Sequence, residues 1–439
     1  MKRTLISRAL TSWFIVVAAL AFAASAFGSG PKFQVLYRFG GTSDGYNPRG
    51  NLIADKAGNL YGTTEYGGAS FYGTVFELSP PATAGGDWTH TILYTFNNTG
   101  DGARPTDGLI IDGKGNLYGT TSDDAGGYGE VFQLSPPASQ GAPWTETVLY
   151  HFQGKQDGAY PRGGVVLGEN GNLFGTTDYT VFELSPPSES GGVWSFFRLH
   201  RFTSQTSDGF SAQAGLVRDK HGNLYGTTLW GGYLTNPSCG SLGCGTVFEL
   251  SPPTGSQGWT EQVIHTFGAS STDGFDPESG LALDANGNLY GTTYSGGTLG
   301  GGIAFQLSPP VTPGGTWTET DIHDFSYGST DGAAPVATVV LDKAGNLYGT
   351  TLFGGNGCFF NTVEYGCGIV YELAPPAGGV GSWNETVLEY FQRGVGTAHQ
   401  STAGVLLGEH GQIYGTTVYG GTYACYEGNG CGTVFRIKP

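Results

Sequence analysis

The chain has 439 residues, of which 78 are glycine; 13 % of the residues are aromatic and only 13 % are charged. Disordered chains are poor in aromatic residues and rich in charge, so this composition indicates an ordered, turn-rich protein. The net charge of −17 disfavours nucleic acid and anionic membrane surfaces as partners, because both are bound through Lys and Arg. Thr, Tyr, Phe and Val are plentiful, which favours an all-β fold.

The N-terminus has the pattern of a secretory signal peptide. Lys2, Arg3 and Arg8 precede the apolar run from Trp13 to Phe22, and Ala24-Ser25-Ala26 follows as a cleavage pattern. An uncleaved anchor helix is the alternative, but the run is shorter than the ~20 residues that span a bilayer. We therefore expect residues 1–26 to be removed and no membrane span to remain. Residues 27–439 should form a single secreted or periplasmic domain.

A heptapeptide, GNLYGTT, dominates the rest of the chain. It begins at Gly58 and returns, sometimes with changes, at Gly115, Gly171, Gly222, Gly287, Gly345 and Gly411. The spacing of 51 to 66 residues suits a β-propeller blade with its loops.

Each unit contains four strand-like runs, here named A to D from the inside of the blade to the outside. The second GNLYGTT unit shows A at Gly108–Asp112, B at Asn116–Thr121 and C at Glu130–Leu134, and the outlying D type is seen at Trp88–Phe96. In the third unit only Asp178-Tyr179 separates B from C, and so short a link joins antiparallel neighbours. The sequence therefore predicts four-stranded antiparallel blades.

The two ends of the repeat region are complementary. The first run, Phe33–Phe39, is of the D type, and the last run, Gly432–Ile437, is of the C type. We expect the first strand to complete the last blade and remove a free sheet edge, whereas unpaired ends would leave an open array. The predicted fold is thus an all-β, seven-bladed β-propeller whose ring is closed by the N-terminal strand.

The glycine inside strand B suggests close packing. Gly62 shares a strand face with Leu60 and Thr64, and a glycine within a strand marks the close approach of another group. We expect Gly62 to make room for a large side chain from the next blade.

The motifs GNLYGTT, YGG, GTVFEL and SPP together resemble the GloVer (Gloeo/Verruco) tandem-repeat family, also described as choice-of-anchor tandem repeat proteins. The resemblance extends from Phe33 to Pro439, with small departures at Phe174 and at Gln412-Ile413. It implies export and a repeat architecture, and it implies no reaction or ligand.

Six cysteines occur as three local pairs, each between strands B and C. The pairs are Cys239 with Cys244, Cys358 with Cys367, and Cys425 with Cys431. In an exported chain this pattern favours three disulfides. A zinc site would need four ligands in one place, whereas these pairs lie in different blades, so no metal site is expected.

Alternating strand directions place the B–C and D–A links on one face of the propeller, which we call the first face. Regular D-x-x-G-N turns and SPP segments form the opposite face. Because the first-face links vary in length and sequence, we expect any ligand to bind there. The candidate aromatic residues are Tyr66, Trp230, Tyr294, Phe353 and Tyr419. The candidate carboxylates, one in each of six D–A links, are Asp44, Asp101, Asp157, Asp208, Asp273 and Asp331.

Simpler roles compete with binding for both sets. The aromatic residues could cover the blade tops, and the aspartates could form Asx-type turns. A ring of six carboxylates at a channel mouth could instead attract Ca²⁺, although no compact calcium loop is present. We expect no other cofactor.

No catalytic residue stands out. The sequence lacks H-E-x-x-H and P-loop patterns. His200, His265 and His323 recur at one position of strand D, with His151 one place later, which favours packing at the rim. We expect an exported, monomeric, non-catalytic propeller that binds a glycan or protein ligand through the first face. The alternatives are a polysaccharide-active hydrolase or lyase and a purely structural envelope protein.

Overall fold

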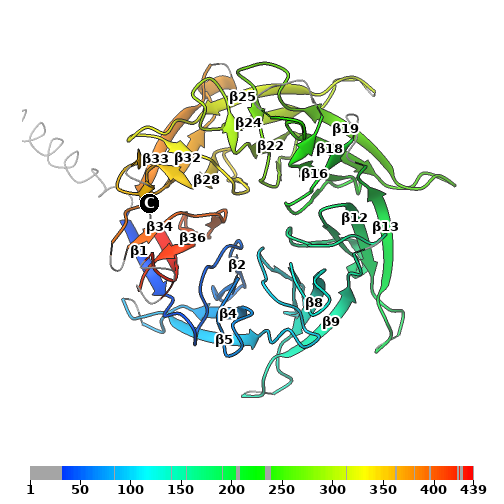
Figure 1. The fold of residues 1–439 in the computed structure, drawn as a ribbon, viewed down its shortest axis with the longest axis vertical. Coiled ribbons are helices and arrows are strands. Elements are labelled where there is room, and N and C mark those ends of the chain that lie inside the picture. The colour runs from blue at the N-terminus through cyan, green and yellow to red at the C-terminus, as the bar shows by residue number, and fades with distance from the viewer. Residues whose placement is uncertain are drawn as a thin grey trace, which may run out of the picture.

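A computed structural model describes residues 32–439 except residues 84, 140, 155, 190, 204–207, 233–238, 313, 361–362, 380, 395–396, 423–424, 426–428 and 439. The expected signal peptide, residues 1–26, lies outside the described residues. Seven four-stranded antiparallel sheets form a closed ring, which confirms the predicted seven-bladed β-propeller (Figure 1). Within the described part of the chain, no helix has the length and apolar character needed to cross a bilayer.

The blades follow one another along the chain, and each is given from its inner to its outer strand. Blades 1 and 2 are β2 (Ile53–Ala54), β3 (Leu60–Thr64), β4 (Thr74–Ser79) and β5 (Thr89–Thr95), then β6 (Ile110–Ile111), β7 (Leu117–Thr121), β8 (Glu130–Ser135) and β9 (Thr145–His151). Blades 3 and 4 are β10 (Val166–Leu167), β11 (Leu173–Thr176), β12 (Thr180–Ser185) and β13 (Ser195–Arg201), then β15 (Val217–Arg218), β16 (Leu224–Thr228), β18 (Thr246–Ser251) and β19 (Thr260–Thr266). Blades 5 and 6 are β21 (Ala282–Leu283), β22 (Leu289–Thr292), β24 (Ile303–Ser308) and β25 (Thr318–Asp324), then β27 (Val340–Leu341), β28 (Leu347–Thr350), β32 (Ile369–Ala374) and β33 (Asn384–Tyr390). Blade 7 is β35 (Leu406–Leu407), β36 (Ile413–Thr417), β38 (Thr433–Lys438) and β1 (Lys32–Arg38).

Short strands and turns complete the fold. Four two-stranded ladders on the first face join a D–A link to the following blade: β14 (Gly209–Phe210) with β17 (Trp230–Gly231), β20 (Gly274–Phe275) with β23 (Ser295–Gly296), β26 (Gly332–Ala333) with β29 (Phe353–Gly354), and β34 (Ala398–His399) with β37 (Tyr419–Gly420). A fifth ladder pairs β30 (Phe359–Phe360) with β31 (Val363–Glu364), and two 3₁₀ turns are η1 (Glu169–Gly171) and η2 (Ala377–Gly379).

The N-terminal strand closes the ring as predicted. β1 pairs antiparallel with β38, with Phe33 opposite Ile437 and Val35 opposite Phe435. In Figure 1 the blue β1 lies beside the last strands of the chain. The outer edge of β38 is therefore covered by the beginning of the chain rather than exposed to solvent.

Gly62 makes room for a large side chain, but the prediction that this side chain comes from the next blade is wrong. A Cβ atom at Gly62 would lie 2.6 Å from Cζ of Phe76 and 2.9 Å from Cδ2 of Leu52. Both residues belong to blade 1, and Phe76 is the cross-strand partner of Gly62. The glycine thus lets the aromatic ring of Phe76, from the same blade, pack directly against strand B.

The same ring forms the contact between blades. Phe39 follows the outer strand of blade 7 and packs edge-on against Phe76, with ring centroids 5.3 Å apart. Equivalent pairs occur at the other six junctions: Phe96–Phe132, Phe152–Phe182, Phe202–Phe248, Phe267–Phe305, Phe325–Tyr371 and Phe391–Phe435. All seven pairs are almost fully buried, so they form the repeated core of the ring.

The remaining letters of GNLYGTT also have structural roles. The Asp55 carboxylate accepts hydrogen bonds from the backbone N–H groups of Ala57 and Asn59, which closes the turn before strand B. The Thr63 hydroxyl donates to the carbonyl oxygen of Asp107 in the next blade, at 3.0 Å. The motif is therefore a building unit of the propeller and not a catalytic signature.

Each D–A link has a non-glycine residue with a left-handed backbone at the same position of the repeat, with φ between 53° and 62°: Asn47, Arg104, Tyr160, Ser211, Asp276, Ala334 and Gln400. The N–H group of each donates to a carbonyl oxygen in the B–C link of the preceding blade. In six of these seven residues, the residue's own carbonyl oxygen also accepts a hydrogen bond from a backbone N–H group of the following blade. Tyr160 is the exception. We call this arrangement the inter-blade clasp.

Candidate functional site

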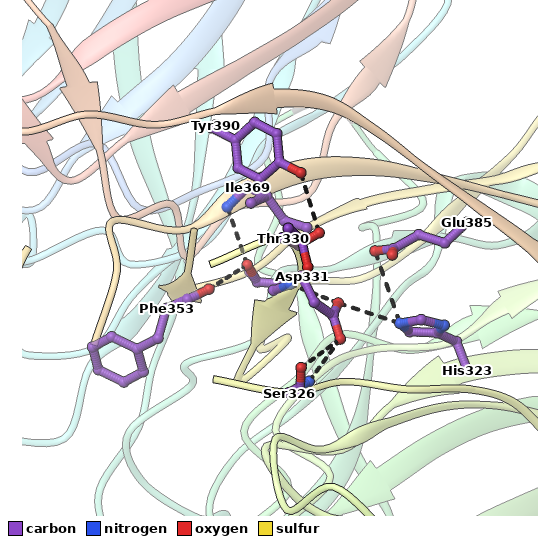
Figure 2. A network of polar contacts seen from close by, with 10 residues as sticks. His323, Ser326, Thr330, Asp331, Phe353, Ile369, Glu385 and Tyr390 are labelled. Atoms are coloured by element: carbon purple, nitrogen blue, oxygen red, sulfur yellow. Dashed lines mark hydrogen bonds and ion pairs between the residues drawn. The ribbon is translucent and has the colours of Figure 1, made fainter. Parts of the chain in front are cut away.

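The six aspartates of the D–A links are held separately, one at each of six blade junctions. Figure 2 shows the example of Asp331, whose Oδ2 accepts hydrogen bonds from the N–H and the hydroxyl of Ser326. Its Oδ1 lies 3.3 Å from Nε2 of His323, which belongs to the outer strand β25. In the same way, Asp44 accepts a bond of 2.7 Å from the Tyr37 hydroxyl. Five of the six carboxylates thus contact the outer strand that precedes them, whereas Asp273 accepts from backbone N–H groups of its own link.

The structure does not gather these aspartates around the axis. A cavity of about 360 Å³ opens at the axis, and none of the six is among its lining residues. Its charged groups include Arg49, which pairs with Glu65 at 2.5 Å, and Arg162, which lies 3.7 Å from Asp178. The aspartates therefore do not form the carboxylate ring that a shared calcium site would need.

The strand D histidines make polar contacts that the sequence analysis did not anticipate. The rings of His200, His265 and His323 pack at the rim, as expected, each against the phenylalanine two residues later. The ring centroids of His323 and Phe325, for example, are 4.6 Å apart. In addition, Nε2 of His323 lies 3.8 Å from Glu385, which comes from the outer strand of the next blade (Figure 2). His200 and His265 occupy equivalent junctions with Glu261 and Glu319. The glutamate near the start of strand D recurs in the repeat as Glu261, Glu319 and Glu385. This recurrence is the sequence signal that could have predicted the contacts between histidine and glutamate.

Three of the five candidate aromatic residues pack within their own part of the first face. The Tyr66 ring stacks on Tyr46 with centroids 5.4 Å apart, and Trp230 lies 5.3 Å from Phe210. Tyr294 is half-buried, and burial is the main cause of its raised pKa. These positions agree with a role in covering the blade tops.

The other two aromatic residues, Phe353 and Tyr419, line one cavity of about 580 Å³ between blades 6 and 7. All of its walls come from B–C and D–A links, so it opens on the first face. The lining residues are Arg49, Leu352, Phe353, Cys358, Phe359, Tyr365, Gly366, Arg393, His399, Gln400, Thr402, Val418, Tyr419 and Asn429. This volume is typical of a small-molecule site, and we call it the first-face cavity.

Aromatic rings form one wall of the first-face cavity. Phe353 and Tyr365 have centroids 5.8 Å apart, and Phe359 is 56 % exposed beside them. On the other wall, Tyr419 stacks on His399 at 5.6 Å. The cavity therefore has aromatic rings on both sides.

His399 supplies a buried acceptor to this cavity. Its Nε2 lies 3.1 Å from the carbonyl oxygen of Asn429, a contact that requires the proton on Nε2. Burial is the main cause that lowers the pKa of His399 to about 4, so the ring is neutral near pH 7. Its Nδ1 is buried without a hydrogen-bond partner.

The cavity carries two guanidinium groups, those of Arg49 and Arg393, which only donate hydrogen bonds. Arg393 donates to the Asn429 side chain at 3.1 Å, and Gln400 is the left-handed residue of the same D–A link. Among the described residues that line the cavity, none carries a carboxylate. This arrangement suits recognition of a hydroxyl-rich ligand.

Arg393, His399, Gln400 and Asn429 were not predicted from the sequence. The signal was present, because Gly396-Thr397 breaks the Asp-Gly rule in this one D–A link. His399 follows at a position occupied elsewhere by Tyr, Phe or Ala. A break in the repeat thus coincides with the cavity.

The three predicted disulfides are confirmed: Cys239–Cys244, Cys358–Cys367 and Cys425–Cys431. Two of them lie in the B–C links of blades 6 and 7, on either side of the first-face cavity, and Cys358 lines it. Disulfides persist in oxidising compartments, so they fit an extracellular or periplasmic protein.

Solved structures share the fold. Virginiamycin B lyase from Staphylococcus aureus is 11 % identical with a TM-score of 0.52, and the match covers 93 % of this chain and 99 % of that protein. The extracellular domain of a hybrid two-component system from B. thetaiotaomicron is 12 % identical with a TM-score of 0.50, covering 94 % of this chain and 41 % of that one. At these identities the likeness extends to the fold alone.

No curated protein matches the sequence. The family model described as the Gloeobacter/Verrucomicrobia repeat matches four overlapping segments, residues 23–181, 82–238, 179–380 and 233–439. Together these segments cover the whole propeller, so the chain belongs to the Gloeobacter/Verrucomicrobia repeat family.

Proposed function

We propose that this protein is an exported, non-catalytic propeller that binds a glycan in the first-face cavity. The observation that carries the proposal is the pairing of exposed aromatic faces with polar groups in one cavity of about 580 Å³. A sugar ring presents C–H groups on its faces and hydroxyl groups at its edge. It therefore matches a site with rings on the walls and hydrogen-bonding groups between them.

The groups of the cavity are suited to separate parts of a sugar. The rings of Phe353 and Tyr419 would stack on its apolar faces. Arg393 would donate to ring or hydroxyl oxygens, and Nδ1 of His399 would accept from a hydroxyl. Because His399 is neutral, this acceptor is present at neutral pH.

Export is supported by the signal-peptide pattern of residues 1–26 and by the three disulfides. Binding is favoured over polysaccharide cleavage because the described lining residues include no carboxylate. A protein ligand would bury a wider surface than this cavity offers.

A glycan array screened with the oxidised protein, followed by calorimetry on the best oligosaccharide, tests the proposal. We expect Tyr419→Ala and Phe353→Ala each to weaken binding at least tenfold. Tyr179→Ala is the matched control, because Tyr179 is a first-face aromatic residue of blade 3 that is 48 % exposed. Absence of glycan binding, or equal loss in all three variants, would overturn the proposal. Binding of a protein but of no glycan would favour the other class of ligand.

A further inference from the structure

Glu130 is the residue of blade 2 that departs most from the repeat. It begins strand C, where the other blades carry Thr74, Thr180, Thr246, Ile303, Ile369 and Thr433. In blade 1 the Thr74 hydroxyl bonds to that of Thr64 at 2.8 Å. In blade 2 the equivalent Thr121 hydroxyl has no hydrogen-bond partner. The substitution therefore removes a structural contact that four other blades retain.

The Glu130 side chain is fully buried among other acids. Its side-chain exposure is 0 %, and Oε2 has no hydrogen-bond partner. The carboxylates of Asp124, Glu146 and Asp101 are the negative charges that act on it. Asp101 and Asp124 are themselves more than nine-tenths buried. An anion placed here is costly unless a positive charge offsets it.

One base faces this cluster. Nδ1 of His151 lies 2.8 Å from Oε1 of Glu130 and 4.0 Å from Oδ2 of Asp124. Asp124 uses its other oxygen, Oδ1, to accept the Tyr128 N–H at 2.8 Å, which fixes the carboxylate in place. One atom from each of Asp124, Glu130 and His151 lies within 4.8 Å of the others. The His151 side chain is 52 % exposed, so this one residue of the cluster reaches the surface.

We propose that Asp124, Glu130 and His151 bind a divalent transition-metal ion, with Zn²⁺ as the best-matched ion. Metal–ligand bonds of ~2.1 Å in a tetrahedral arrangement separate the ligand atoms by roughly 3.4 Å. This value lies between the 2.8 Å and 4.0 Å that separate His151 Nδ1 from Glu130 and Asp124. Three protein ligands leave the fourth position open to water or another molecule.

The ligand set distinguishes this site from the calcium ring considered for the aspartates of the D–A links. Ca²⁺ takes six to eight oxygen ligands, whereas a nitrogen with two carboxylates suits Zn²⁺ and its neighbours. The spacing of the cysteine pairs predicted no metal site, and it carries no information about Asp124, Glu130 and His151. All three ligands here come from blade 2.

Restoring the repeat provides the sharpest test. Glu130→Thr replaces a buried acid by the residue found in four other blades, and it should reform the hydroxyl pair with Thr121. Without metal, this variant should be at least as stable as the parent protein. We expect the parent, stripped with a chelator, to bind Zn²⁺ by calorimetry and to give a tetrahedral Co²⁺ absorption spectrum. Glu130→Thr should lose both signals.

His151→Ala should weaken Zn²⁺ binding at least tenfold. His323→Phe is the control, because His323 also lies beside two carboxylates but at a different place, the junction between blades 5 and 6. It should leave the Co²⁺ spectrum and the Zn²⁺ affinity unchanged. An unchanged Zn²⁺ stoichiometry in Glu130→Thr would overturn the proposal, and so would loss of binding only in His323→Phe.

Discussion

The carbonyl oxygen of Cys244 accepts a hydrogen bond of 3.0 Å from the backbone N–H of Asp276, across the junction between blades 4 and 5. Asp276 is the left-handed residue of its D–A link. The carbonyl oxygens of Cys367 and Cys431 accept equivalent bonds from Gln400 and Asn47. In all three disulfides the second cysteine is therefore the acceptor of the inter-blade clasp. The disulfides fix the junctions between blades as well as the loops that contain them.

Replacing both Cys239 and Cys244 by alanine should loosen this junction. A bridge that closes so short a loop contributes about 2 kcal/mol in the chain-entropy model. We expect a lower melting temperature and faster hydrogen exchange at the Asp276 amide, which hydrogen–deuterium exchange would measure.

Arg104 provides the internal control for that experiment. Its N–H makes the same clasp to the carbonyl oxygen of Tyr72, in a link without a disulfide. Its exchange rate should stay unchanged in the double variant. Equal acceleration at both amides would indicate global destabilisation and contradict a local role for the bridge.

Gly62→Ala should destabilise the ring, because the new Cβ would lie 2.6 Å from the Phe76 ring. Overpacking of this kind costs about 1–3 kcal/mol, which thermal or denaturant unfolding would show. Gly113→Ala is the control, since a Cβ there meets nothing within 4 Å. A second change, Phe76→Leu, should recover part of the loss in Gly62→Ala. Full stability of Gly62→Ala would contradict the close packing.

The architecture was predictable because each blade needs the same turn, ring and hydroxyl contacts, so the sequence repeats them. The partner of Gly62 was not predictable in the same way. Alternation shows which strand face a residue occupies, but Phe76 of the same blade and a residue of the next blade can both fill that face. The innermost strands are also shorter than expected, such as Ile110–Ile111 within the predicted run Gly108–Asp112.

The candidate site was harder to predict, because its residues are defined by departures from the repeat. Phe353 and Tyr419 were selected as aromatic residues of variable links, and they share a cavity. His399 and Arg393 carry no motif, and their positions became meaningful only when two neighbouring blades were placed side by side. Glu130 was counted as an ordinary strand residue, since burial cannot be read from its letter.

Glu319→Gln should alter how stability depends on pH. Burial, then the charges of Asp273 and Asp321, raises the pKa of Glu319 to about 8, and His265 lies 3.5 Å away. The folded state therefore holds this proton more tightly than the unfolded chain, whose pKa is 4.5. The stabilisation is complete below pH 4.5 and is lost as pH rises to 8, by at most about 1.4 kcal/mol per pH unit.

The uncharged glutamine removes that dependence. Unfolding by urea between pH 5 and 8 should give a flatter profile for Glu319→Gln and a higher free energy of unfolding at pH 8. Glu189→Gln, at an exposed position, should follow the parent profile. A variant that is less stable than the parent at pH 8 would show that the charged carboxylate stabilises the junction.

Removal of residues 32–40 should open the ring, because β1 is the outer strand of blade 7. The loss exposes the edge of β38 and removes Phe39, which is fully buried against Phe76. We expect a lower melting temperature and self-association through the free edge, measured by thermal unfolding and gel filtration. A synthetic peptide of residues 32–40, added in excess, should pair with β38 and restore both properties, whereas a scrambled peptide should not. If the truncated chain remained monomeric and melted at the parent temperature, β1 would not be the strand that holds the ring closed.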